Sequence, residues 1–95
     1  MTDLLGESEI TGRLVDIPAW IREGNAISRT VQFDTFADGI DFISRLAPVA
    51  DEADHHPDID IRYRNVKFLL ASHDSGGITG RDFAMAEKID GLLRG

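Results

Sequence analysis

Polar and apolar side chains alternate along two stretches of the chain, which predicts β-strands. Between Ala26 and Phe33, apolar residues recur at even spacing among polar ones, at Ile27, Val31 and Phe33. A second β-rich run, Trp20-Ile21-Arg22, precedes this stretch across the short connection Glu23-Gly24-Asn25. Because strand side chains point alternately to the two faces of a sheet, the pattern predicts a β-hairpin with one buried face.

The segment from Asp58 to Arg64 alternates polar and apolar residues without interruption, and Val66 to Ser72 supplies a further β-rich run. A two-residue turn at Arg64-Asn65 is the simplest connection between them. Pro57 has no amide hydrogen to donate to a sheet, so the first of these strands is expected to begin after it. A second hairpin is therefore predicted in the latter half of the chain.

Two further segments have apolar residues spaced three or four positions apart, as helices do. The first helix is expected from Glu7 to Asp16, with Ser8 as its cap. The second helix is expected to begin at a cap formed by Asp34 or Thr35, and five apolar residues should face its core: Phe36, Ile40, Ile43, Ala47 and Ala50. Pro48 lies inside this helix and predicts a kink, because proline removes an amide donor and crowds the preceding turn.

A third helix follows the glycine pair Gly76-Gly77. Thr79 and Asp82 have the spacing of a capping box, with the aspartate in place of the usual Glu or Gln. The helix carries one apolar side: Phe83, Ala86, Ile89 and Leu93. The predicted order is α-β-β-α-β-β-α, and two hairpins separated by a helix favour an α+β fold with a four-stranded antiparallel sheet and helices packed on one face.

Length and charge narrow the range of partners. The 95 residues are expected to form a single domain, 1–95, that buries only somewhat more than ~60% of its unfolded surface, so self-association is expected. A net charge of -7 opposes binding to phosphate backbones, so no direct binding of nucleic acid is expected. The amino terminus lacks the pattern of an export signal and no apolar run reaches membrane-spanning length, so a cytoplasmic location without membrane attachment is expected.

The chain has no cysteine, which excludes disulfides and thiolate chemistry. Its three histidines, His55, His56 and His73, fall in one segment. If the turn lies at Arg64-Asn65, the same register continued past the strands places His56 opposite His73. Imidazole can both give and take a proton near neutral pH, so three imidazoles close together indicate proton-transfer chemistry.

Each of these polar residues also has a structural explanation. Adjacent imidazoles at a helix end often cap the last carbonyls, and His73 alone is more typical of a strand end than of a catalyst. Asp82 serves as the reciprocal cap of Thr79, and Asp51 and Asp54 are ordinary solvated carboxylates of a helix. A metal site is disfavoured, because adjacent histidines rarely converge on one ion and no H-x-x-x-H spacing exists.

The spacing of these residues resembles that of the pterin-4a-carbinolamine dehydratases. In that family an acidic or similar residue, His-His-Pro, an aromatic residue, a histidine and an aspartate follow one another, and the matching positions here are Asp51, His55-His56-Pro57, Tyr63, His73 and Asp82. The resemblance extends from about Leu4 to Leu93. It implies the α-β-β-α-β-β-α fold, with sheets joined edge to edge in homodimers that often pair into homotetramers.

The resemblance also implies an activity, the removal of water from 4a-hydroxytetrahydropterin to give quinonoid dihydropterin during tetrahydropterin recycling. The pterin is the substrate, so no metal or organic cofactor is expected, and an aromatic amino acid hydroxylase would supply it. By position, the implied catalytic set is His55, His56 and His73, of which His55 and His73 would exchange protons and His56 would chiefly hold the pterin. Implied substrate contacts are Asp54, Pro57, Ser72 and Asp74, and implied supporting carboxylates that orient imidazoles are Asp51 and Asp82.

Two other functions remain open. Some relatives on this scaffold bind transcription factors and others assemble a carbon-fixing enzyme without catalysis, so a non-catalytic binding or assembly protein is the alternative. Non-catalytic relatives tend to lose the histidine set, which this chain keeps. The remaining alternative is a plain oligomeric α+β module whose histidines only cap helices.

Overall fold

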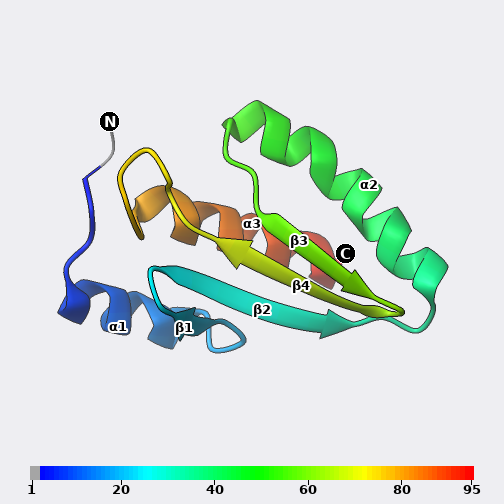
Figure 1. The fold of residues 1–95 in the computed structure, drawn as a ribbon. Coiled ribbons are helices and arrows are strands. Elements are labelled where there is room, and N and C mark those ends of the chain that lie inside the picture. The colour runs from blue at the N-terminus through cyan, green and yellow to red at the C-terminus, as the bar shows by residue number, and fades with distance from the viewer. Residues whose placement is uncertain (1–2) are drawn as a thin grey trace.

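The computed structural model describes residues 3–95, and within them the elements follow the predicted order α-β-β-α-β-β-α (Figure 1). Their bounds are α1 (Glu7–Asp16), β1 (Ile21–Glu23), β2 (Ala26–Gln32), α2 (Phe36–Ala53), β3 (Asp58–Arg62), β4 (Asn65–Leu70) and α3 (Gly80–Arg94). The first two residues belong to the segment in which no export signal is expected, and they lie outside the described residues. None of the helices within residues 3–95 combines the length and hydropathy needed to span a membrane.

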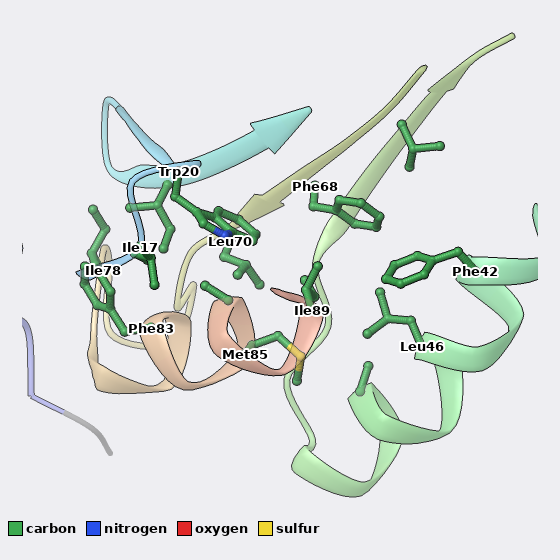
Figure 2. Close-up of a cluster of buried hydrophobic side chains, with 14 of the residues drawn as sticks. Ile17, Trp20, Phe42, Leu46, Phe68, Leu70, Ile78, Phe83, Met85 and Ile89 are labelled. Carbon is green, nitrogen blue, oxygen red and sulfur yellow. The ribbon is translucent and has the colours of Figure 1, made fainter. Parts of the chain in front are cut away.

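The strands form one antiparallel sheet in the order β1-β2-β4-β3. Although β4 comes last in the chain, it lies inside the sheet between β2 and β3, so β1 and β3 form the two edges. Helices α2 and α3 lie against the same face of the sheet, as Figures 1 and 2 show. The predicted α+β fold, with a four-stranded antiparallel sheet and helices on one face, is confirmed.

The hydrophobic core lies between the sheet and helices α2 and α3 (Figure 2). Its largest fully buried side chains come from four elements: Phe42 and Leu46 of α2, Ile27 of β2, Phe68 and Leu70 of β4, and Met85 and Ile89 of α3. The rings of Phe42 and Phe68 meet edge to face, with centroids 5.7 Å apart and planes inclined by 69°. Aromatic pairs favour this geometry because the positive ring edge meets the negative face. The core therefore joins α2 and α3 to the central strand β4.

The face of α2 that enters the core differs in part from the predicted one: Ala50 is buried and Ile43 packs against the core, as predicted. The buried apolar side chains of this helix are Phe42, Leu46 and Ala50. Phe36 and Ile40 are 50% and 39% exposed, and Ala47 is exposed as well, so their predicted core role is wrong. The helix carries two apolar stripes, and periodicity alone does not choose between them; packing of Phe42 on Phe68 selects the second stripe.

The caps of the first two helices test the predicted helix starts. Helix α1 begins after Gly6, which provides no side-chain cap, so the predicted cap at Ser8 is wrong. Two acidic side chains in the first turn instead face the positive end of the helix dipole. In α2, Thr35 Oγ1 accepts a hydrogen bond from the Asp38 amide at 3.0 Å, which identifies Thr35 as the cap. Helix α2 then continues through Pro48 to its end.

The turn of the second hairpin lies one residue before the predicted turn. Arg62 pairs with Asn65, so the turn residues are Tyr63 and Arg64. Tyr63 has a φ of 55°, the positive value that a tight hairpin turn needs at its first central residue. Asparagine is common in turns, which explains why the sequence favoured a turn containing Asn65. This shift moves the pairing of β3 with β4 by two residues, so opposite partners change while each side chain keeps the sheet face that the predicted register gave it.

Candidate active site

The end of α2 delivers two of the three histidines. Asp54 closes the helix in the left-handed conformation, with φ 50° and ψ 42°, which aspartate tolerates better than most residues with a side chain. Its amide donates to the Asp51 carbonyl at 3.1 Å, and the His55 amide reaches the Ala50 carbonyl at 3.2 Å. The chain then becomes extended, so the His55 side chain is buried whereas the next one, His56, is exposed.

The segment after β4 delivers the third histidine. Ser72 anchors a tight loop, because its amide donates to the Gly77 carbonyl at 2.8 Å and its carbonyl accepts from the Gly76 amide at 2.9 Å. Gly76 has a φ of 82°, a conformation that suits glycine because it lacks a Cβ. His73 lies at the exposed side of this loop, while Ser72 is buried.

All three histidines line one open cavity of about 340 Å³. The complete lining is Asp54, His55, His56, Ala71, His73, Asp74 and Arg81. The structure thus brings together two segments that are joined by the β3-β4 hairpin, and it places the predicted substrate contacts Asp54 and Asp74 beside the imidazoles. The cavity volume falls within the ordinary range for small-molecule sites.

Four other residues predicted for the site lie outside this lining. Pro57 and Asp51 line a neighbouring, more apolar hollow between α2 and β3, which His56 also borders. Ser72 and Asp82 are fully buried. These two side chains therefore do not face the cavity, and they influence it through hydrogen bonds that lead to the lining residue His55.

A buried hydrogen-bond network connects His55 to the start of α3. His55 Nε2 lies 2.6 Å from Asp82 Oδ1. The second carboxylate oxygen, Oδ2, accepts from the Ser72 hydroxyl at 3.0 Å and from the Thr79 amide at 2.9 Å. The Ser72 and Thr79 hydroxyls are 2.7 Å apart. Asp82 and Thr79 form the predicted capping box, so one carboxylate both caps α3 and holds an imidazole.

The other two imidazoles have different surroundings. His56 Nε2 lies 2.8 Å from Asp51 Oδ1, and both side chains are largely exposed. His73 is exposed, and its imidazole makes no hydrogen bond with another side chain among residues 3–95. The three histidines are therefore held to different degrees: one by a buried carboxylate, one by an exposed carboxylate and one by neither.

The observed register corrects the predicted pairing of His56 with His73. Continued past the ends of β3 and β4, the register places His55 opposite Ser72. Both of these side chains bind Asp82, which agrees with their lying on the same face. His56 consequently lies at the rim of the cavity, as expected for the neighbour of a buried residue in an extended segment.

Sequence reasoning missed Ala71 and Arg81 in the cavity lining. Arg81 Nη2 donates to Asp74 Oδ1 at 2.5 Å. This hydrogen bond outweighs the opposing effect of desolvation and, with the charge of Arg81, holds the pKa of Asp74 below its usual range. The only available signal was the position of Arg81 beside Asp82, since the contact with Asp74 depends on how the intervening loop folds back.

The arrangement is suited to moving protons on a small polar molecule. Imidazoles from two separate segments face one cavity, so a bound ligand can meet a proton donor and a proton acceptor at different atoms. Carboxylates at Asp54 and Asp74 and the guanidinium of Arg81 add hydrogen-bonding groups to the same surface. No group of three or more His, Asp or Glu side chains in the described part of the chain is arranged to hold a metal ion.

Comparison with known proteins gives consistent matches over nearly the whole chain. Residues 3–92 match the model of the family described as pterin 4 alpha carbinolamine dehydratase. A protein from Mycobacteroides abscessus named "Putative pterin-4-alpha-carbinolamine dehydratase" is 52% identical over 87 residues, covering 92% of this chain and 93% of its own length. A protein from Nocardia farcinica with the same name is 50% identical over 93 residues, covering 98% of both chains.

Solved structures agree with the sequence matches. A transcriptional coactivator/pterin dehydratase from Brucella melitensis superposes with a TM-score of 0.90 at 32% identity, covering 95% of this chain and 98% of its own. A pterin dehydratase-like protein described as a RuBisCO assembly factor in the alpha-carboxysome shares the fold, with a TM-score of 0.65 at 23% identity over 78% of this chain and 88% of its own. The family match and the full-length relatives together show that this chain belongs to the pterin 4 alpha carbinolamine dehydratase family.

Proposed function

We propose that this protein removes water from 4a-hydroxytetrahydropterin and releases quinonoid dihydropterin. The observation that carries the proposal is the convergence of His55, His56 and His73 on one cavity in a chain of this family. In the reaction the C4a–O bond breaks, the hydroxyl leaves as water after gaining a proton, and N5 loses its proton as the C4a=N5 double bond forms. One proton is therefore delivered and one removed at neighbouring atoms of a bicyclic ring, a task suited to two imidazoles.

The geometry supports distinct roles for the three histidines. His55 and His73 come from opposite sides of the hairpin connection, and we assign them to proton exchange. His56 is held at the rim by Asp51, and we assign it chiefly to positioning the pterin ring. Carboxylates at Asp54 and Asp74 in the lining are suited to the hydrogen-bond donors of the pterin. Pro57 and Ser72 lie outside the lining, so their proposed contribution is to shape the backbone around the substrate.

Stopped-flow absorbance with chemically prepared 4a-hydroxytetrahydropterin tests the proposal. The wild-type protein should dehydrate it faster than buffer does, and His73→Ala should lower the rate on the order of 10²-fold, because a positioned acid or base contributes at least that much. Thr30→Ala, which changes an exposed residue of β2, is the matched control and should keep the wild-type rate. The proposal fails if the wild-type protein does not accelerate dehydration.

The dependence of the rate on pH gives a second test. Imidazoles ordinarily change charge between pH 5 and 8. If one imidazole donates a proton and another accepts one, the rate should change across this interval, because each group works in only one protonation state. A rate that is constant from pH 5 to 9 would contradict the use of imidazoles, even if the protein accelerates the reaction.

Homodimers or homotetramers are part of the proposal. All five residues of the edge strand β3 are exposed, and Ile59 and Ile61 are each 37% exposed. An open strand edge of this kind is suited to pairing with another copy of the chain. Light scattering coupled to size exclusion should therefore show a mass of two or four chains. The proposed source of the substrate is an aromatic amino acid hydroxylase.

A binding role is the alternative function. The Brucella melitensis relative is described both as a transcriptional coactivator and as a pterin dehydratase, so the two descriptions occur together on this fold. The dehydration assay separates the alternatives for this chain. Catalysis that depends on His73 supports the enzyme, whereas no catalysis by the wild-type protein leaves the binding role.

A further inference from the structure

A buried hydrogen-bond network joins His55 Nε2 to Asp82, Ser72 and Thr79. We infer that Asp82 is a positioning residue that keeps the proton of neutral His55 on Nε2 and so leaves Nδ1 as a proton acceptor for the cavity. The inference deepens the proposed function, on which its catalytic part rests. It assigns His55 the role of base and Asp82 the role of fixing its tautomer.

The directions of the hydrogen bonds follow from one donor that cannot be reversed. The Thr79 amide can only donate, and it donates to Asp82 Oδ2 at 2.9 Å. The Ser72 hydroxyl donates to the same oxygen at 3.0 Å and therefore accepts from the Thr79 hydroxyl, 2.7 Å away. Thr79 Oγ1 in turn accepts from the Arg81 amide at 3.2 Å. Every hydroxyl in the network then both donates and accepts, and both donors at Oδ2 are satisfied.

The other carboxylate oxygen of Asp82, Oδ1, determines which ring nitrogen of His55 carries the hydrogen. Two donors, the Thr79 amide and the Ser72 hydroxyl, converge on Oδ2 of Asp82, an arrangement that suits an ionised carboxylate. An ionised carboxylate only accepts hydrogen bonds, so His55 Nε2, 2.6 Å from Oδ1, must carry a hydrogen. In neutral imidazole the other nitrogen is then an acceptor. His55 lines the cavity, and its Nδ1 makes no hydrogen bond with any residue in 3–95.

Burial makes this constraint effective. Asp82 is completely buried and His55 nearly so, which leaves little room for water to replace either partner. An unpaired polar group is costly in such a place, so the alternative tautomer, with two acceptors facing each other, is disfavoured. The exposed pair of His56 and Asp51 lacks this protection, because water can satisfy both side chains.

The variant Asp82→Asn should reverse the direction of the hydrogen bond at His55 Nε2, because asparagine has nearly the same shape as aspartate but can donate. Its amide oxygen must face the Thr79 amide, because that donor cannot turn around. The amide NH2 group then takes the place of Oδ1 and donates to His55 Nε2, which moves the ring proton to Nδ1. The cap of α3 is retained, because the amide oxygen still accepts from Thr79. The expected result is a folded protein whose cavity faces a proton donor where the wild type has an acceptor.

Two-bond ¹H–¹⁵N correlation spectra of ¹⁵N-histidine-labelled protein, recorded above the imidazole titration range, test this directly. The His55 signals should show the Nε2–H tautomer in the wild type and the Nδ1–H tautomer in Asp82→Asn. Asp41→Asn, a change at a 71% exposed side chain of α2 outside the lining, is the control and should leave the His55 pattern unchanged. An Nδ1–H tautomer in the wild type overturns the inference, whatever the catalytic rate.

Kinetics test the catalytic part of the inference. Asp82→Asn should lower kcat on the order of 10²-fold with little change in KM, because the base is lost while the cavity lining is kept. Asp82→Glu keeps a carboxylate at a position where capping boxes normally have Glu, and it should retain the Nε2–H tautomer and recover part of kcat. Equal losses in both variants, with the tautomers unchanged, would show a merely structural role. No dehydration by the wild type would overturn the proposed function and leave the tautomer result standing.

Discussion

Two adjacent histidines each bind an aspartate in this protein, and the two pairs differ mainly in burial. His55 Nε2 lies 2.6 Å from Asp82, and the side chains are 9% and 0% exposed. His56 Nε2 lies 2.8 Å from Asp51, and the side chains are 56% and 76% exposed. In water an ion pair gains little, because solvent screens the charges and satisfies the partners. In the interior, loss of one partner leaves the other without a substitute.

The pairs also differ in how far apart their members lie in the sequence. Asp51 and His56 are five positions apart at the end of one helix, whereas His55 and Asp82 are 27 positions apart and meet only when α3 packs beside the hairpin. The local pair can form and break without disturbing the fold. The distant pair forms only when α3 packs against the rest of the fold. The same kind of contact is therefore expected to stabilise the protein at His55 and to contribute little at His56.

Removal of the buried carboxylate should have the largest effect. Asp82→Ala is expected to lower the free energy of unfolding by about 3 kcal/mol, because His55 loses its buried partner and α3 loses its cap. Urea denaturation followed by circular dichroism measures this change. A loss below about 1 kcal/mol would show that the interior around Asp82 admits water, and the contrast between the two pairs would disappear.

Removal of the buried imidazole should have the next largest effect. His55→Ala is expected to cost about 2 kcal/mol, because Asp82 keeps its Ser72 and Thr79 donors but loses the third. The same urea experiment applies. A double-mutant cycle with Asp82→Ala should give a coupling energy well above the scatter of additive mutations, about 0.5 kcal/mol. Additive losses would mean that the two side chains stabilise the fold independently.

Removal of the exposed carboxylate should have a small effect. Asp51→Ala is expected to change the free energy of unfolding by no more than about 0.5 kcal/mol, since His56 can turn to water. Comparison of its urea midpoint with that of Asp82→Ala gives the contrast directly. If both changes destabilised the protein equally, burial would not be the property that separates the pairs.

The exposed ion pair of Asp74 and Arg81 should have the smallest effect, and it should be confined to acid. Because Arg81 holds the pKa of Asp74 below its usual range, the contribution is complete above about pH 4 and is lost as the pH falls through the lowered pKa. Asp74→Asn should therefore match the wild-type melting temperature in acid and lie slightly below it near neutral pH. Scanning calorimetry from pH 3 to 7 measures the difference, and a gap that widens toward acid would contradict the assignment.

The predictions from sequence were most accurate where local signals act alone. The bounds of α1 and the capping box at Thr79 and Asp82 depend on neighbouring residues, and both are confirmed. The Ser8 cap was wrong because a polar residue near a helix start does not show which position begins the helix. The hairpin turn was misplaced by one residue because both candidate turns contain two residues and direct the same strand faces to the core, so the alternation of polar and apolar residues does not separate them.

The sequence by itself determined the family, the order of elements and the proximity of the histidines, because each follows from spacing along the chain. Only the tertiary structure decided that His55 is the buried imidazole, that Asp82 holds it and that Arg81 reaches the cavity. Those outcomes depend on the register of β3 against β4 and on the docking of α3. Both are set by packing between different elements of the fold. A change of one residue in strand register moves a side chain from solvent to core. Composition or periodicity within a segment does not contain that information.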